Sequence, residues 1–393
     1  MKNFEKILSY IFPAVVLAGF LGRGVFNVSV LLVLLLSIAL YRKMDFDVLR
    51  RDPVLRGWFI FLFFVLVANI FAIELSFSLK KFSVFAIYSF VVLGSGRYLY
   101  GYSMDRDGNL ERAVSVLTFT ALFVSLLVIA NTLAGIDLLE YIRKGVKVPQ
   151  YGNYHFRLSI AVNIFAISFY WSMKKRLPYL LISVMAVETM GVFCSGSRTA
   201  MVAFVGMLAV FVFVKNGKRI FSRELFITVF LVGAAVWASY ILSPYAKIRI
   251  GSFDTTFLPK GDHMSGRYEL FAATAGEISK SLLYGRGVKS AVKHPVEYGA
   301  SSSKHPHNIY LEVLLDSGLV GFIPFLFFLW VLYRSFTGVG TDAAPALYAS
   351  LAGLFLTSLA SWSIWSANHI SVMMTVLAVL LGMSASSGKR MGS

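Results

Sequence analysis

The chain has 393 residues, of which 57% are hydrophobic and 15% are charged, and its formal net charge is +17. A soluble domain usually has about 25% charged residues, so this composition excludes an ordinary soluble protein and makes the bilayer its solvent. The positive charge does not indicate nucleic-acid binding, because the Lys and Arg residues lie in short clusters between apolar segments, as topology signals do.

Apolar segments recur from end to end and predict transmembrane helices. A helix needs about 20 largely apolar residues to cross a bilayer, or somewhat fewer when its ends are aromatic or snorkelling. Such segments lie near 7–22, 25–41, 58–74, 82–96, 113–133, 158–172, 178–194, 199–214, 225–243, 318–333, 344–360 and 368–385. The sequence therefore predicts an all-α polytopic membrane protein, with one membrane domain over residues 1–393.

The basic residues predict how these spans are oriented. They gather in the second connection and in later even-numbered ones: Arg42, Lys43, Arg50, Arg51, Arg56, Lys174, Lys175, Arg176, Lys215, Lys218, Arg219 and Arg223. Connections rich in Lys and Arg stay in the cytoplasm. Both termini are then cytoplasmic, and the long connection from about 244 to 317 faces the periplasm of a bacterial inner membrane.

The long connection has helical patterns of its own. Ser265 precedes apolar residues that recur at helical spacing, and Gly285 or Gly287 can close the helix. A second helix is expected to begin at Asn308 and to break at Gly318, just before the next span. His307 would then lie at the mouth of the membrane domain.

Two arginines on the predicted outer side are candidates for binding an anion. Arg198 follows Ser197 in a very short connection, and Arg267 stands at the start of the loop helix, where backbone N–H groups also favour an anion. A guanidinium presents several donors to phosphate oxygens. A lone arginine at such a place is as often a snorkelling anchor or an exposed surface charge, but two on one side suit a diphosphate.

Two histidines lie beside the predicted membrane surface, in the segment Lys304-His305-Pro306-His307-Asn308. A neutral imidazole can take a proton from a sugar hydroxyl near neutral pH. The alternative for a loop histidine is a solvated or hydrogen-bonding role. A zinc site is not predicted, because three protein ligands are usual at a catalytic zinc and only His294 is nearby.

Other features give weaker signals. The single cysteine, Cys194, lies in an apolar segment and is expected to be a packed thiol. Glu188 interrupts the seventh span and is expected to face the bundle rather than lipid. No Walker or Rossmann pattern occurs, so no nucleotide cofactor is predicted.

The order of these motifs resembles the O-antigen ligase and polymerase superfamily of bacterial membrane glycosyltransferases. The matching segments are Gly196-Ser197-Arg198-Thr199-Ala200, Ser265-Gly266-Arg267, Gly285-Arg286-Gly287, His307-Asn308-Ile309-Tyr310, and Gly318-Leu319-Val320-Gly321 with Phe325. They cover roughly the second half of the chain. Some members have an acid near the start of the last external connection, where this chain has Ser361-Trp362-Ser363-Ile364-Trp365.

The resemblance implies a fold of about twelve transmembrane helices with a large periplasmic loop. It implies transfer of a glycan from undecaprenyl diphosphate to the lipid A–core acceptor, by a metal-independent, inverting reaction without a cofactor. Arg198 and Arg267 match the arginines that hold the diphosphate, and His307 matches the histidine that activates the acceptor hydroxyl. Ser197, Arg286 and Asn308 are expected to support them.

Three alternatives stay open at this point. A polymerase of the same superfamily shares donor and topology; the ligase is favoured because the long loop is late and single, although the 135–157 connection is also basic. A protein-glycosylating transferase is less favoured because the chain has no large extra domain. A transporter of lipid-linked glycan is disfavoured because charged residues inside the spans are sparse.

Overall fold

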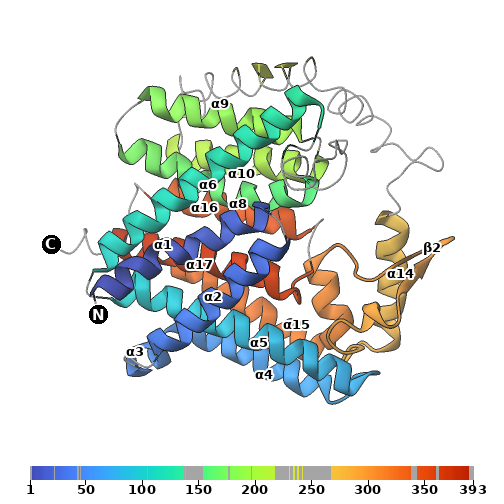
Figure 1. Ribbon diagram of the computed structural model, residues 1–393. Helices are drawn as coiled ribbons and strands as arrows, with labels where there is room; N and C mark the ends of the chain where they lie inside the picture. The colour runs from blue at the N-terminus through green and yellow to red at the C-terminus, as the bar shows by residue number, and fades with distance from the viewer. Residues whose placement is uncertain are drawn as a thin grey trace.

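A computed structural model describes most of the chain and shows an all-α protein (Figure 1). The described residues are 2–21, 23–41, 44, 46–103, 105–136, 138, 154–175, 178–195, 197–216, 230, 233–234, 237–238, 241, 267–337, 343–359 and 363–388. Its first helices are α1 (Lys2–Leu21), α2 (Arg23–Tyr41), the short α3 (Phe46–Arg51), α4 (Pro53–Asn69) and α5 (Leu75–Arg97). The π-helical turn η1 (Tyr98–Tyr102) then leads into α6 (Arg106–Ala134).

The second half of the chain adds the remaining helices and a small hairpin. They are α8 (Tyr154–Lys174), α9 (Pro178–Cys194), α10 (Arg198–Asn216), α14 (Arg267–Lys280), the 3-10 turn η2 (Ser290–Val292), β1 (Val296–Tyr298), β2 (Ser301–Ser303), α15 (Ile309–Phe336), α16 (Ala344–Ser358) and α17 (Ala367–Gly388). Strands β1 and β2 pair antiparallel. In Figure 1, α14 and the hairpin lie at one side of the helical body, away from the start of α1.

The predicted spans are confirmed as helices except for 225–243, which lies largely outside the described residues. Within the described residues, three helical segments are long and apolar enough to cross a membrane: Leu75–Tyr102, Arg106–Ala134 and Ile309–Phe336. Shorter apolar helices accompany them, including Pro53–Asn69 and Ala344–Ser358. The chain is therefore an all-α polytopic membrane protein.

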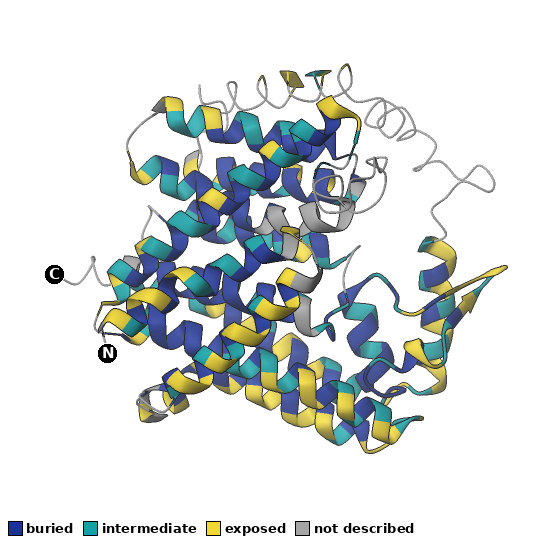
Figure 2. Cartoon of the chain, in the orientation of Figure 1, coloured by how far each residue is buried: buried dark blue, intermediate teal, exposed yellow. Residues whose placement is uncertain are grey.

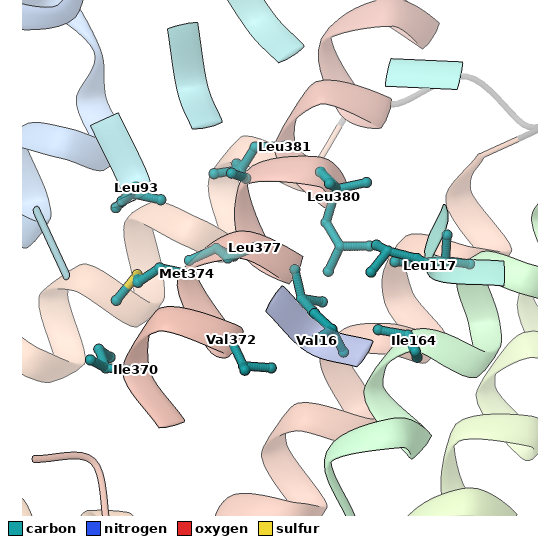
Figure 3. Close-up of a cluster of buried hydrophobic side chains, with 14 of the residues drawn as sticks. Val16, Leu93, Leu117, Ile164, Ile370, Val372, Met374, Leu377, Leu380 and Leu381 are labelled. Carbon is teal, nitrogen blue, oxygen red and sulfur yellow. The ribbon is translucent and has the colours of Figure 1, made fainter. Parts of the chain in front are cut away.

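The helices pack around one large apolar core. Figure 3 shows part of it, where Leu377 and Leu380 of α17 lie among Val16 of α1, Leu117 of α6 and Ile164 of α8. Figure 2 shows buried residues through the middle of the bundle and many exposed ones along the outer helices. Exposed phenylalanines such as those of α4 suit a surface that faces lipid tails.

The third span begins at Pro53 rather than near residue 58, because a capping interaction fixes its start. The Asp52 side chain accepts hydrogen bonds from Val54 N at 2.9 Å and from Leu55 N at 3.0 Å. The other Asp52 oxygen lies 2.6 Å from Arg97 Nη2. Because proline lacks an N–H, it is well suited to the first position of a helix. This end of α4 is thereby tied to the end of α5.

The predicted break at Gly318 is confirmed, since that residue has φ 58° and ψ −164° inside α15. A backbone clasp crosses the break: the segment 282–287, which follows α14, exchanges hydrogen bonds with α15 on both sides of Gly318. These bonds run from Arg286 N to Leu315 O, Gly287 N to Asp316 O, Leu319 N to Leu282 O, and Val320 N to Leu283 O, at 2.8, 2.8, 2.9 and 3.1 Å. The clasp fixes the loop region relative to the membrane helices.

Candidate active site

The site begins where the loop enters α15. Asn308 caps this helix, because its side-chain oxygen accepts hydrogen bonds from Tyr310 N at 2.9 Å and from Leu311 N at 3.1 Å. The prediction that the helix starts here is confirmed. His307, directly before the cap, has a left-handed backbone with φ 56°. A side chain other than glycine rarely adopts this conformation unless the surrounding structure imposes it.

His305 and His307 lie against each other. Their ring centroids are 3.9 Å apart, and His305 Nδ1 accepts a hydrogen bond from His307 N at 3.3 Å. Neutral His305 therefore carries its proton on Nε2. The Ser303 hydroxyl donates to the His305 carbonyl at 2.7 Å, which helps to fix the backbone of His305.

Both imidazoles are half-buried and uncharged near neutral pH. Burial lowers the pKa of His305 to about 4, with further lowering from the charges of His307, His369 and Lys289. Burial also lowers the pKa of His307, and the neighbouring Arg267 lowers it further. A neutral His307 can accept a proton, as a general base must.

The structure brings Arg267 close enough to His307 to affect its charge. Arg267 is the first residue of α14, and this helix packs against both α15 and β1. Leu270 and Ile278 of α14 are buried with Leu315 of α15 and Val296 of β1. This small core holds the start of α14, with the Arg267 guanidinium, beside the histidine pair.

Arg198 is the first residue of α10. The buried Ser197 precedes it and caps the helix, since its hydroxyl accepts a hydrogen bond from Ala200 N at 3.3 Å. Ser197 N in turn donates to the Ser195 hydroxyl at 3.1 Å. The Arg198 side chain lies outside the described part of the structure, which shows the backbone position of this residue.

Arg286 is engaged in the loop itself. Its guanidinium is buried and lies 2.9 Å from the Glu277 carboxylate, and it donates to the His294 carbonyl at 3.1 Å. These contacts hold the end of the loop helix to the segment before β1. Arg286 is therefore placed to stabilise the loop, and its two partners leave it less free to bind a substrate.

Two carboxylates in the first turns of α15, Glu312 and Asp316, are buried. Glu312 Oε2 accepts a hydrogen bond from Ile364 N at 2.8 Å, so this acid reaches the last connection, which has no acid of its own among residues 361–365. Asp316 accepts from Lys289 N at 2.9 Å and from the Ser290 hydroxyl at 3.0 Å. The first turns of α15 thus organise two loops around the site.

Sequence reasoning missed Lys289, Asp316 and His369 as neighbours of the site. Lys289 and His369 lie close enough to His305 to lower its pKa. Burial lowers the pKa of Lys289 itself, Lys81 lowers it further, and Glu312 and Asp316 raise it. The one signal in the sequence was the place of Lys289 two residues after the Gly285-Arg286-Gly287 motif.

Among the described residues, no group of three or more His, Cys, Asp or Glu side chains is arranged to hold a metal ion. Glu188 is buried, as expected, and accepts a hydrogen bond from the Ser168 hydroxyl. Cys194 is a buried free thiol, also as expected.

The part of the chain that contains these residues also matches a known family. Residues 180–326 match the family model described as O-antigen ligase. This segment is therefore similar to O-antigen ligases. The matched segment includes Arg198, Arg267, Lys289, His307 and Asp316, so the candidate site lies almost entirely within it. No curated protein matches the chain.

Proposed function

We propose that this protein is an O-antigen ligase, which transfers a glycan from undecaprenyl diphosphate to the lipid A–core acceptor. The observation that carries the proposal is a half-buried His307, whose pKa is lowered by burial and by the nearby Arg267, inside the segment that matches O-antigen ligase. A proton acceptor beside a fixed cation suits a reaction in which a hydroxyl attacks and a diphosphate leaves.

The direction of α4 supports a site on the periplasmic side of the inner membrane. The helix begins beside α3, which carries Arg50 and Arg51. It ends at Asn69, whose side chain accepts a hydrogen bond from Val288 N in the site loop at 3.0 Å. At 1.5 Å per residue, a helix of 17 residues is about 25 Å long. The basic cluster and the site loop are therefore at opposite ends of this apolar helix.

The chemistry needs one proton acceptor and cations for the leaving group. The acceptor hydroxyl oxygen attacks the anomeric carbon of the glycan, and the bond from that carbon to the diphosphate oxygen breaks, with inversion. His307 takes the hydroxyl proton, and the electron pair of the broken bond stays on the diphosphate. Arg267 and Arg198 stabilise that charge. A general base of this kind contributes about 10²–10⁴-fold.

Purified protein incubated with undecaprenyl-diphosphate glycan and rough lipopolysaccharide tests the proposal. Transfer of glycan to the lipid A–core is the expected result, and His307→Ala should abolish it. His305→Ala should keep substantial turnover, because the Asn308 cap still fixes His307. Free repeat unit, offered in a parallel reaction, tests the polymerase: extension of that acceptor alone would show that the ligase assignment is wrong.

A further inference from the structure

Lys289 shares a backbone feature with His307. Among the described residues, these two are the non-glycine residues with positive φ, at 58° and 56°. An L-residue with a long side chain is disfavoured in this conformation, and such residues cluster at functional sites. Both lie in the loop that enters α15, and both are near His305.

The conformation of Lys289 is imposed by Asp316. The Asp316 carboxylate accepts a hydrogen bond from Lys289 N at 2.9 Å, and its second oxygen accepts one from the Ser290 hydroxyl at 3.0 Å. The Asp316 carbonyl accepts a third bond, from Gly287 N at 2.8 Å. Because Asp316 is buried in α15, the Lys289 backbone is fixed relative to the membrane helices.

The fixed backbone directs the Lys289 side chain from a defined point beside the site. The side chain is half-buried, and its charge interacts with Glu312, Asp316 and Lys81 as well as with His305. In the part of the chain that the structure describes, no carboxylate forms an ion pair with this ammonium. Glu312 and Asp316 instead direct oxygens to Ile364 N, Lys289 N and Ser290.

We propose that Lys289 is a further substrate-binding residue, whose ammonium binds a phosphate oxygen of the substrate beside the His305–His307 pair. An ammonium with three donors that is partly removed from water, and that forms no ion pair within the described residues, favours such an oxygen. The phosphate is either the diphosphate of the lipid-linked donor or a phosphate of the lipid A–core. This inference rests on the proposed function.

The first experiment measures binding of undecaprenyl diphosphate to the full-length protein in detergent. The decisive variant is Lys289→Gly, because glycine adopts φ 58° without strain and removes only the side chain. The matched control is Lys293→Gln, which removes an exposed lysine of the same loop, whose ammonium lies 5.7 Å from the centre of the Phe77 ring. Both variants lower the net charge by one, so a general electrostatic effect would be common to them.

The second experiment measures steady-state transfer with donor and acceptor varied separately. Lys289→Gly is expected to unfold at or above the parental temperature and to raise the KM of one substrate by about tenfold or more, the effect of losing one charge-assisted hydrogen bond. A raised KM for the lipid-linked donor, with weaker undecaprenyl diphosphate binding, identifies the diphosphate. A raised KM for rough lipopolysaccharide alone identifies the acceptor phosphate. Lys293→Gln should stay close to parental in both assays.

Two results would overturn the inference, and they are distinguishable. If Lys289→Gly keeps both KM values and binding at parental levels, Lys289 binds no substrate phosphate, while the proposed function stands. If the parental protein neither binds undecaprenyl diphosphate nor transfers glycan, the proposed function fails and the inference with it.

Discussion

The hydrogen-bonded clasp at the Gly318 break lets us predict how alanine substitutions at different glycines of the loop region change the stability of the protein. Gly285 has φ 71°, and a Cβ atom at this position would lie 2.6 Å from Asp316 C, Ser317 N and Gly318 N. All three are backbone atoms of α15, so none can move aside by a rotamer change. Gly285→Ala is therefore destabilising for two reasons. Alanine is disfavoured at this positive φ, and its Cβ atom would push the two hydrogen-bonded segments of the clasp apart.

Two other glycines separate these contributions. Gly299, in the turn between β1 and β2, has φ 55°, and a Cβ atom there would have no neighbour within 4 Å. Gly299→Ala should therefore lower the free energy of unfolding only by the cost of a left-handed backbone, about 1–2 kcal/mol. Gly276 is a helical residue of α14 in open space, so Gly276→Ala should stabilise by about 0.5–1 kcal/mol.

The clash adds to the conformational cost for Gly285→Ala. Separation of the segments weakens the clasp hydrogen bonds, which contribute about 0.5–1.5 kcal/mol each. If two of them are lost, the total is about 2–5 kcal/mol, which is a severe effect for one substitution. The loop that carries Lys289 would also shift, so transfer activity should fall with stability.

Thermal unfolding in detergent, followed by intrinsic fluorescence, measures the order of the three variants. The expected order of unfolding temperature is Gly276→Ala at or above the parent, then Gly299→Ala, then Gly285→Ala lowest. Equal unfolding temperatures for Gly285→Ala and Gly299→Ala would refute the reasoning, because they would show that the clasp yields to a methyl group without cost.

Three further predictions concern the proposed reaction and topology. Replacing Arg198 or Arg267 by Lys keeps the positive charge but loses the planar guanidinium with its paired donors, so glycan transfer should fall severely while the protein still folds. Near-normal transfer by both variants would show that these arginines only anchor their helices. Because the pKa of His307 is lowered by burial and by Arg267, its base form should persist below pH 6.5. A plot of log(kcat/KM) against pH should therefore bend below 6.5, and a bend above 7 would contradict the assignment. A periplasm-active reporter should be active when fused near residue 290 and inactive near residue 217, and the reverse pattern would overturn the orientation.

The sequence alone was enough to predict the helices and where several of them begin. Apolar segments of bilayer length report the spans directly, because hydrocarbon leaves no water to satisfy an irregular backbone. The start of α15 at Asn308 and the break at Gly318 were also predictable, since both depend on local backbone chemistry. The prediction for His307 and Arg267 came from motif order, and the structure brings these two residues together.

Only the tertiary structure decided how the site is supported. Asp316 fixes Lys289 across 27 residues of sequence, and Glu312 holds Ile364 across 52. No periodicity encodes such pairs, because each depends on where two distant segments meet. For the same reason the sequence did not reveal that Arg286 pairs with Glu277, or that a lysine would occupy a left-handed position beside the histidines. Local chemistry determined the helices and their ends, and the packing of α14 and the loops against α15 determined which charges share the site.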